Sequence, residues 1–247
     1  MLNFFRSHKE PARFPYSIEP HCHLLPGVDH GAKTVDSAFE LIKDEHDMGV
    51  NHFILTPHVT EGTFENTPET LAAGFEKITK KVKEEGLNVG LRYSAEYRVD
   101  DYFLKQMKNK QLVPMPGNFI LIENSHYQET IHLDETIYNL QSEGYRIIMA
   151  HPERYPYYKH NTQRMRYLHD LGVLFQINLL SLSGYHGAGP KEACNWLIEN
   201  QMIDLLASDM HHYSHVEVLK EYLTSRDWKK LSLRITPYLQ NDIIFPD

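Results

Sequence analysis

Two histidines separated by one residue, His21 and His23, stand at the end of the first predicted strand of the chain. Because side chains alternate between the two faces of a strand, residues two apart project to the same side, so these imidazoles point to one place. Such a pair could bind a metal ion, although partly buried histidines are also common in proteins without one. Cys22, which lies between them, is expected to point the other way and to pack as a small apolar side chain.

Histidine and carboxylate side chains also follow other predicted strands. They occur in the segments Thr56-Pro57-His58, Ala95-Glu96, His151-Pro152-Glu153-Arg154 and Asp209-Met210-His211. Taken singly, each has an ordinary explanation, such as capping a loop or facing solvent. If the strand ends meet at one rim, however, the rim collects imidazoles and carboxylates that would repel one another and lose hydration unless cations neutralised them. The pattern therefore predicts a metal cluster with these ligand candidates: His21, His23, His58, Glu96, His151, Asp209 and His211.

The predicted ligand set contains nitrogen and carboxylate oxygen but no thiolate, which suits Mn, Zn or Fe. It is too large for a single ion, whereas two or three divalent ions that share carboxylate bridges would accommodate it. Clusters of this kind bind phosphate, lower the pKa of a bound water and stabilise charge on a leaving oxygen, so we infer hydrolysis of a phosphate ester. Arg154 could hold two phosphate oxygens through its planar guanidinium, or it could instead form a surface ion pair with Glu153.

The elements that must position these residues follow from the apolar pattern. Short apolar runs alternate with amphipathic stretches at a spacing of roughly 30 residues, as in alternating strands and helices. The predicted strands are residues 17–23, 52–57, 87–96, 119–123, 146–151, 173–178 and 203–209. The predicted helices are residues 35–48, 68–85, 100–108, 134–143, 162–171, 190–200 and 214–224. Four of these helices are followed at once by a glycine, which favours the left-handed conformation that ends a helix: Gly49, Gly86, Gly144 and Gly172.

Seven strand and helix units favour a closed (β/α)7 barrel of the α/β class, in which functional side chains gather at the carboxyl ends of the strands. The nearly continuous apolar strands agree with this, because helices cover one face and the barrel interior covers the other. An open doubly wound sheet is the alternative, but it usually carries a glycine-rich phosphate loop after its first strand, and this sequence has none there. The 247 residues fit one such domain, predicted at 18–247, after an exposed or loosely docked extension at 1–17.

The composition argues against several classes of protein. A net charge of −8 and a pI near 6.0 disfavour nucleic acid as the main partner. No apolar run approaches the roughly 18 to 20 residues of a membrane-spanning helix, and the first residues lack the apolar core of a secretory signal. We therefore predict a soluble, cytoplasmic protein without membrane insertion. Cys22 and Cys194, the two cysteines, are far apart in sequence and predict neither a disulfide framework nor a zinc knuckle.

The segments that carry chemistry resemble the polymerase and histidinol phosphatase (PHP) superfamily. Within it they are most similar to the manganese-dependent protein-tyrosine phosphatases encoded with bacterial capsule and exopolysaccharide genes. The His-x-His and Asp-x-His pairs are common to the superfamily, whereas His-Pro-Glu-Arg and Pro-Gly-x-Asp-x-Gly-Ala point to the tyrosine phosphatases. The matching segments appear in the same order between about residues 20 and 215: they are residues 21–32, 56–58, 95–96, 122–123, 150–154, 176–184 and 207–211.

The resemblance implies a distorted barrel of seven units that binds two or three divalent ions, in the first place Mn, with Zn or Fe as alternatives. One ion would be held by His21, His23, Glu96 and Asp209, and Glu96 would bridge to a second ion that also uses His151. A third would take His58, His211 and His30, which stands where relatives have an aspartate. Asp29 is a nearby substitute for that aspartate. The residues expected to act directly in catalysis are Arg154, His151 and Asp209.

Two positions depart from the pattern of the family. Glu19 stands where relatives usually have aspartate two residues before the His-x-His pair, and we expect it to orient a ligand histidine by accepting its ring hydrogen. A second arginine that follows Asp-x-His in many relatives is missing, and His215 and Val216 occupy its neighbourhood. Lys191 and His212 are candidate replacements for this arginine in binding phosphate.

The resemblance implies hydrolysis of phosphotyrosine, with a bacterial tyrosine autokinase of polysaccharide synthesis or export as the protein partner. No covalent cysteine intermediate is needed, and a phenolate leaving group with a pKa of about 10 requires little general-acid help. Three alternatives remain: a small-metabolite phosphatase of the histidinol phosphate type, a nuclease, which the acidic balance disfavours, and a metal-binding regulatory protein with reduced activity. Four tyrosines could line a groove for the substrate ring or could pack within loops: Tyr155, Tyr157, Tyr158 and Tyr185.

Overall fold

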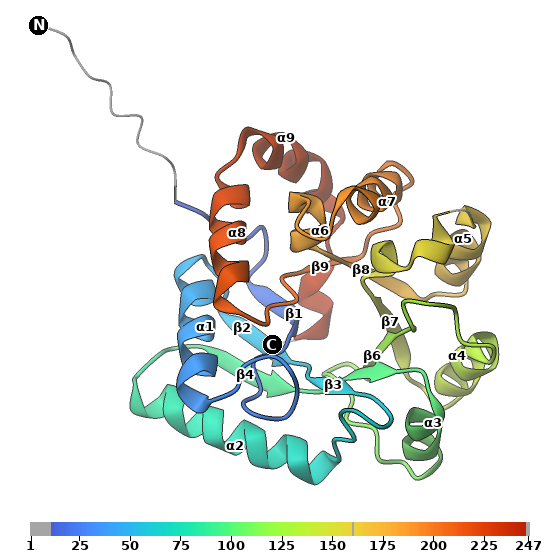
Figure 1. The fold of residues 1–247 in the computed structure, drawn as a ribbon, viewed down its shortest axis with the longest axis horizontal. Helices are drawn as coiled ribbons and strands as arrows, with labels where there is room; N and C mark the ends of the chain where they lie inside the picture. The colour runs from blue at the N-terminus through green and yellow to red at the C-terminus, as the bar shows by residue number, and fades with distance from the viewer. Residues whose placement is uncertain (1–10, 160, 246–247) are drawn as a thin grey trace, which may run out of the picture.

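The computed structural model describes residues 11–159 and 161–245 (Figure 1). Most of the expected N-terminal extension, residues 1–10, lies outside the described residues. In its remaining part, Phe14 and Tyr16 are buried in the main hydrophobic core, and the amide of Phe14 donates a hydrogen bond to the carbonyl of Met48 at 3.0 Å. This part of the expected extension therefore packs on the domain.

The paired strands run parallel and form two sheets in the described part of the chain. The first sheet has the order β1-β2-β4, and the second has the order β3-β5-β6-β7-β8-β9. The strands are β1 (Ile18–Cys22), β2 (His52–Leu55), β3 (His58–Val59), β4 (Gly90–Tyr93), β5 (Glu96–Arg98), β6 (Phe119–Glu123), β7 (Arg146–Ala150), β8 (Leu174–Asn178) and β9 (Leu205–Ala207).

Two predicted strands are each broken into two pieces. The predicted strand 52–57 forms β2 and then β3, and Pro57 lies in the break, where it cannot donate a ladder hydrogen bond. The predicted strand 87–96 forms β4 and then β5. Backbone hydrogen bonds continue across both breaks, because the amide of Ser94 donates to the carbonyl of Leu55 at 2.9 Å and the amide of Glu96 donates to that of Pro57 at 3.0 Å. The two sheets are therefore consecutive parts of one wall.

This wall closes on itself where β1 meets the segment after β9. Cys22 forms a parallel bridge with Met210, and the amide of His23 donates to the carbonyl of Met210 at 2.8 Å. The amide of Asp209 donates to the carbonyl of His21 at 3.0 Å. If each broken strand is counted once, seven strand units follow one another around the wall in the described residues, which is compatible with the predicted (β/α)7 barrel.

The helices lie outside the strands (Figure 1). They are α1 (Val35–Asp47), α2 (Pro68–Glu84), α3 (Asp101–Lys108), α4 (Leu133–Ser142), α5 (Thr162–Asp170), α6 (Leu179–Ser183), α7 (Ala188–Glu199), α8 (Tyr213–Leu223) and α9 (Arg226–Ile235). Short 3-10 turns are η1 (Pro152–Arg154), η2 (Pro156–Tyr158), η3 (Thr236–Tyr238) and η4 (Asn241–Ile244). The seven predicted helices are confirmed, with ends that differ by at most two residues. Between residues 11 and 245, residue 160 aside, no helix combines the length and apolar character needed to span a bilayer.

Two helices, α6 and α9, were not predicted from the sequence. α6 is a single short helix directly after β8, too brief to show a helical period. α9 begins at a cap that the sequence does contain, because the side chain of Ser225 accepts a hydrogen bond from the amide of Trp228 at 3.0 Å. Its apolar face packs Trp228 and Ile235 into the core.

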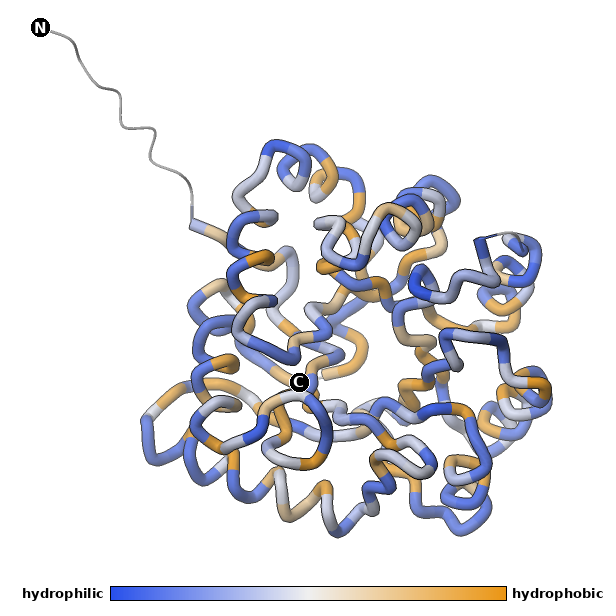
Figure 2. Tube along the Cα trace, in the orientation of Figure 1, coloured by the Kyte–Doolittle hydropathy of each residue, from blue (hydrophilic) through white to orange (hydrophobic). Residues whose placement is uncertain are grey.

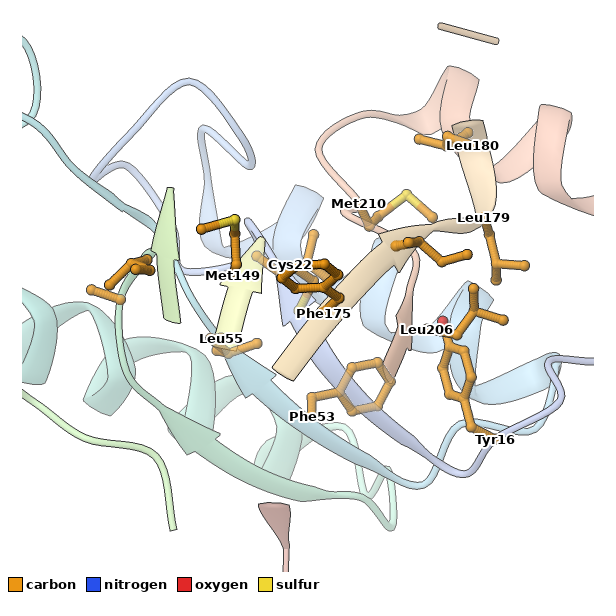
Figure 3. Packing of buried hydrophobic residues seen from close by; sticks show 14 of the residues in the cluster. Tyr16, Cys22, Phe53, Leu55, Met149, Phe175, Leu179, Leu180, Leu206 and Met210 are labelled. Carbon is orange, nitrogen blue, oxygen red and sulfur yellow. The ribbon is translucent and has the colours of Figure 1, made fainter. Parts of the chain in front are cut away.

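Apolar strand residues divide between two clusters according to the side on which they project. In β6, Ile120 and Ile122 belong to the large cluster shared with the helices, whereas Phe119 and Leu121 belong to a smaller cluster in the barrel interior. Figure 2 shows the hydrophobic residues concentrated on the strands and on the inner faces of the helices. Figure 3 shows side chains of the large cluster, which come from several strands and include Cys22.

An irregularity in β1 reverses the direction of its side chains. Ile18 belongs to the interior cluster, so strict alternation would send His21 towards the helices. From residue 19 to residue 22, however, β1 advances three positions while its partner β2 advances two. This β-bulge places Cys22 in the helix-side cluster, as predicted, and turns His21 and His23 to the barrel interior.

Candidate metal centre

The predicted ligand residues meet at the carboxyl ends of the barrel strands. His21 and His23 lie at the end of β1, and His151 directly follows β7. Two further ligand candidates, Glu96 and His58, begin β5 and β3, which are the later pieces of the two broken strands. Asp209 and His211 follow β9 at the point where the wall closes. The split strands and the closure thus place residues from distant parts of the chain in one site.

Four of these side chains direct one atom each at a common point. The Nε2 atoms of His21 and His23 lie 3.1 Å apart. Each lies between 3.3 and 3.5 Å from Oε2 of Glu96 and from Oδ1 of Asp209. An ion bonded at about 2.1 Å to four tetrahedral ligands would hold those ligands about 3.4 Å apart. The spacing of the four atoms therefore fits one ion between them.

Glu96 lies at the centre of the site because each of its oxygens faces imidazole nitrogens. Its Oε1 lies 2.8 Å from Nε2 of His151, and its Oε2 lies 2.9 Å from Nδ1 of His58. The Oε2 atom also faces His21 and His23 at the distances given above. A carboxylate in this position can bridge neighbouring ions.

Glu123, at the end of β6, joins the site although it was not among the predicted ligands. Its Oε1 lies 3.3 Å from Nδ1 of His58 and accepts a hydrogen bond from Nε of Arg98 at 3.1 Å. Ligand atoms of His58, Glu96 and Glu123 all lie within 4.8 Å of one another. The sequence contained a signal for this residue, because Glu123 ends a predicted strand just as the predicted ligands do.

The remaining predicted ligands form a third group at the mouth of the site. Ligand nitrogens of His23, His58 and His211 lie within 4.8 Å of one another. The exposed His30 stacks its ring on that of His58 at 4.8 Å and lies 4.6 Å from the ring of His211. In the described residues His30 is not part of a group whose ligand atoms converge, so it borders this position.

Among the described residues, several buried polar atoms of this site have no hydrogen-bond partner, which supports its fit to cations. They include Nδ1 of His58, Oε2 of Glu96, Oδ1 of Asp209 and Nε2 of His211. Buried polar groups are normally paired, because each unpaired group costs about 1 to 3 kcal/mol. These atoms are nitrogen and carboxylate oxygen donors directed at one another, which is the donor set that divalent ions of the Mn, Fe or Zn type accept. The residues therefore fit a metal cluster.

The charges in the site favour ionised carboxylates. Burial alone would raise the pKa of Glu96, but the positive imidazoles of His21 and His58 lower it well below its ordinary value. Burial likewise opposes ionisation of Asp209, yet His21 and His211 hold its pKa well below its usual range. The site thus presents two buried negative charges among imidazoles.

Asp29 orients one of the ligand candidates. Its Oδ2 lies 2.7 Å from Nδ1 of His23 and accepts a hydrogen bond from the amide of His58 at 3.0 Å. Its Oδ1 accepts from the amide of Gly31 at 2.8 Å, which fixes the first loop. The carboxylate therefore fixes the ring of His23 with Nε2 facing the site. The expected role of Asp29 as a replacement ligand is not what this geometry favours, because both of its oxygens are already engaged.

Among the described residues Glu19 forms no hydrogen bond with a histidine ring, so the role predicted for it was wrong. Its Oε1 accepts from the backbone amide of His21 at 3.0 Å, and its Oε2 accepts from Tyr16 at 2.8 Å and from the amide of Ser208 at 3.0 Å. The ring atom Nδ1 of His21 instead lies 2.7 Å from Oε1 of Gln176. Glu19 therefore fastens β1 to the segment after β9, and burial raises its pKa to about 7.

Gln176 and Asn178, on β8, were not predicted as site residues. Gln176 contacts the ring of His21, and its Nε2 donates to Oδ1 of Asn178 at 2.7 Å. Asn178 in turn donates from Nδ2 to Oδ2 of Asp209 at 2.7 Å. This chain of hydrogen bonds holds Asp209 with its other oxygen directed at the two histidines of β1. Both residues lie within a segment that carried the family resemblance, which was the available signal.

Arg154 lies at the site as predicted, and its alternative as a surface ion pair with Glu153 is wrong. Its Nη1 donates to Oδ2 of Asp209 at 3.1 Å, and the buried Glu153 instead accepts from the amide of Asn178 at 3.0 Å. Arg154 lines a cavity of about 400 Å³ at the mouth of the site. The same cavity is lined by His30, His58, Arg98, Glu123, His126, His151, Tyr185, His186, Asp209, His211, His212 and His215.

The candidates for phosphate contacts divide into those at the cavity and those outside it. His212 and His215 line the cavity, and Nδ1 of His215 accepts a hydrogen bond from the amide of His211 at 3.3 Å. Burial lowers the pKa of His215 to about 4, so this ring is neutral near pH 7. Lys191 lines a different cavity, with Asp227 and Arg234, so this placement does not favour it as a replacement for the missing arginine.

The four tyrosines considered for a substrate groove fall into two sets, one packed within loops and one at the cavity. Tyr155 and Tyr158 are almost fully buried, and their hydroxyls donate to the carbonyl of Ala150 and to Glu129 within the loops. Tyr157 donates to the carbonyl of Ser125 at 3.0 Å. Loop packing is therefore the correct interpretation for these three. Tyr185 is exposed and lines the cavity.

Two proposed catalytic residues have left-handed backbone conformations. His151 has φ of +35° and Asp209 has φ of +51°. Such conformations are uncommon for residues other than glycine and cost of the order of 1 to 3 kcal/mol, so they occur mostly where function or packing requires them. Here His151 turns directly after β7 and Asp209 turns two residues after the end of β9, and both face the candidate metal centre.

Comparisons with known proteins identify relatives of this chain. Residues 17–220 match the model of the family described as capsular polysaccharide synthesis, CpsB/CapC. The tyrosine-protein phosphatase YwqE of Bacillus subtilis is 28% identical over 196 residues, which cover 79% of this chain and 77% of YwqE. The tyrosine-protein phosphatase CpsB of Streptococcus pneumoniae is 27% identical over 206 residues, with 79% and 83% of the two chains covered.

A solved structure supports the same relationship. It comes from a study of YwqE from Bacillus subtilis and CpsB from Streptococcus pneumoniae, described as unique metal-dependent tyrosine phosphatases. It superposes with a TM-score of 0.76 at 25% identity and covers 90% of this chain and 95% of its own. The match of the family model over most of the barrel, together with this likeness in fold, identifies the chain as a member of the CpsB/CapC family.

Proposed function

We propose that this protein hydrolyses phosphotyrosine in proteins and that it depends on two or three divalent ions. One observation carries the proposal: the carboxylate of Glu96 faces four imidazoles at 2.8 to 3.4 Å, those of His21, His23, His58 and His151. Asp209 faces two of the same rings, and Arg154 stands beside it at the cavity. The relatives YwqE and CpsB are tyrosine-protein phosphatases, which supports phosphotyrosine as the substrate.

The proposed ligands follow from the groups of described residues whose ligand atoms converge. One ion would be held by His21, His23, Glu96 and Asp209, a second by Glu96 and His151, and a third by His58 and His211, with Glu123 beside His58 and His30 at the border. Mn suits this mixture of imidazole and carboxylate, and Zn or Fe would be accepted by the same donors. When bound, such ions supply a Lewis acid and a water of lowered pKa.

The residues of the chain itself bind and position the substrate. Arg154 donates from Nη1 to Asp209, and its other N–H groups, which have no hydrogen bond to the described residues, can donate to phosphate oxygens. Asp209 cannot turn away, because Asn178 donates to the same Oδ2 atom at 2.7 Å. The leaving phenolate has a pKa of about 10, so the reaction needs little help from a general acid.

The cysteines are not placed to act as nucleophiles. Cys22 and Cys194 are fully buried in the helix-side core, and burial raises the pKa of both thiols well above the ordinary value. The reaction we propose is therefore direct hydrolysis without a covalent cysteine intermediate.

We further propose a bacterial tyrosine autokinase of capsule or exopolysaccharide production as the protein substrate, met in the cytoplasm. The support is the family match, which concerns capsular polysaccharide synthesis. Two arginines at the cavity, Arg98 and Arg154, favour an anionic group such as phosphate.

The test compares purified protein with and without metal on a phosphotyrosine peptide. We expect hydrolysis with Mn, loss of activity after chelation, recovery when Mn is returned, and no loss after treatment with iodoacetamide. Unchanged activity after thorough chelation would contradict the proposal. Histidinol phosphate is measured alongside, because faster turnover of that compound would assign the site to a small metabolite. Full metal content without any hydrolysis would favour a regulatory protein.

A further inference from the structure

His186 lies in a short loop whose shape depends on two glycines. Tyr185 and His186 join α6 to α7, and Gly184 and Gly187 flank them with φ of +92° and +96°. Glycine adopts this left-handed region readily, so the chain can turn on both sides of the two residues. The ring of Tyr185 contacts that of His186 edge-on at 5.2 Å between centroids. The loop therefore holds His186 at the wall of the cavity that Arg154 also lines.

The nitrogen Nε2 of His186 is buried, and it has no hydrogen-bond partner in the part of the chain that the structure describes. Leaving a buried donor or acceptor unpaired is unfavourable, and native structures normally provide a partner. A ligand in the cavity can be that partner. His186 does not belong to any of the groups of described residues whose ligand atoms converge on an ion position, so its nitrogen is not needed there.

The charges around His186 favour a neutral ring. Burial lowers the pKa of His186 to about 4, the positive charge of Arg154 acts in the same direction, and Asp209 opposes it. A neutral imidazole carries one hydrogen, which can reside on Nε2 and be donated. The ring thus adds a hydrogen-bond donor beside Arg154 without adding another charge. A donor of this kind suits the oxygen of an anion.

We propose that His186 is a substrate-contacting residue, whose Nε2–H donates a hydrogen bond to an oxygen of the same phosphate that Arg154 binds. This inference rests on the proposed function, because it takes a phosphate ester as the ligand of the cavity. A phosphate group has enough oxygens to accept from both residues while it also faces the ions. The nearby His215 already uses Nδ1 on the amide of His211, whereas Nε2 of His186 has no such engagement among the described residues.

The experiment uses inorganic phosphate as the probe and three variants of the Mn-loaded protein. His186→Phe removes the donor but keeps a planar ring, and His186→Gln keeps an N–H donor near the same position. His132→Phe is the matched control, because His132 is an exposed residue before α4. Three quantities are measured for each: the dissociation constant of phosphate by calorimetry, KM and kcat on p-nitrophenyl phosphate, and bound Mn by elemental analysis.

We expect His186→Phe to bind phosphate about tenfold more weakly and to raise KM more than it lowers kcat. His186→Gln is expected to stay within about threefold of the wild type, since it retains a donor. All variants should keep their metal, and His132→Phe should match the wild type.

Three results would overturn the assignment. Unchanged phosphate affinity in His186→Phe would show that no contact is made. A loss of bound Mn in this variant would indicate that His186 is a metal ligand. Equally weakened phosphate binding in the Phe and Gln variants would indicate that His186 acts through packing and not through a donated hydrogen bond. Failure of the proposed function is recognised separately, because it would appear as a wild-type protein that binds phosphate without hydrolysing the ester. A wild-type protein that binds no phosphate would overturn both.

Discussion

The Nε2 atom of His151 lies 2.8 Å from Oε1 of Glu96, although 55 residues separate the two along the chain. The other oxygen of the same carboxylate faces His21, His23 and His58. One side chain therefore contacts at least one ligand of every proposed ion position. Loss of this single charge should disturb the site more than loss of any one imidazole.

The substitution Glu96→Gln tests this relationship. It keeps the shape of the side chain but removes the negative charge and places an amide among four imidazoles. We expect bound Mn to fall and hydrolysis to drop by at least about a thousandfold, equivalent to about 4 kcal/mol of lost transition-state stabilisation. Elemental analysis and turnover of an aryl phosphate measure the two effects. Glu135→Gln, on an exposed position of α4, is the control, and full metal content with full activity in Glu96→Gln would refute the bridging role.

Replacing Arg154 should weaken substrate binding more than it weakens metal binding. A hydrogen bond from a charged donor contributes about 1.5 to 3 kcal/mol, so Arg154→Ala is expected to lower kcat/KM about tenfold to a hundredfold. Arg154→Lys should recover part of the loss, because it restores the charge but not the planar fork. Inhibition by inorganic phosphate provides the measurement. Arg166→Lys, on α5 where Arg166 contacts Asn200, is the control, and equal inhibition of all variants would argue against Arg154 as a phosphate contact.

Asp29→Asn should reduce metal affinity without removing a proposed ligand. The carboxylate lies 2.7 Å from Nδ1 of His23 and holds the ring that presents Nε2 to the ions. Loss of such an orienting partner typically costs 10- to 100-fold in metal affinity, and we expect about that range here. Competition with a calibrated chelator measures the affinity for Mn. Asp47→Asn, at the exposed end of α1, is the control and should leave the affinity for Mn unchanged. An unchanged affinity in Asp29→Asn as well would mean that the loop alone fixes the ring of His23.

The ion pair of His169 and Asp204 predicts how stability changes with pH. Nε2 of His169 lies 3.1 Å from Oδ2 of Asp204, and this hydrogen bond raises the pKa of His169 above its ordinary value of about 6.5. A group with a higher pKa in the folded state stabilises the fold while it is protonated. Its contribution is therefore fully present below about pH 6.5 and is lost as the pH rises through the folded-state pKa.

The magnitude of this effect should be small, because His169 is partly exposed and solvent screens the pair to less than about 1 kcal/mol. Urea unfolding of the wild type and of His169→Gln, measured from pH 5.5 to pH 9, gives the difference in the free energy of unfolding. We expect this difference to shrink as the pH rises. A difference that grew with pH would mean that the sign of the linkage is wrong.

The sequence predicted most of the site because strand periodicity is a local property. His21 and His23 share a face by alternation alone, and Asp209 and His211 follow a strand end in the same way. Glu123 could have been found by the same argument, since it also ends a predicted strand. The role of Gln176 was harder to predict from the sequence, because it depends on contact with the ring of His21 on a distant strand.

Other parts of the structure had no local signal. Glu19 was expected to contact a ring, but Gln176 already occupies the ring nitrogen of His21, and only the closed barrel brings these three residues together. His186 stands in a loop with no strand before it, so no pattern placed it at the cavity. The helix α6 is too short for periodicity to indicate it.

The extra residue in β1 makes this strand one residue longer than the stretch of β2 beside it. If position 20 were deleted, Glu19 and Cys22 would stand two positions apart, like their partners Phe53 and Leu55, and the two histidines would keep their side. We therefore expect a homologous segment that is one residue shorter at this point to be accepted in this barrel, with a straighter first strand.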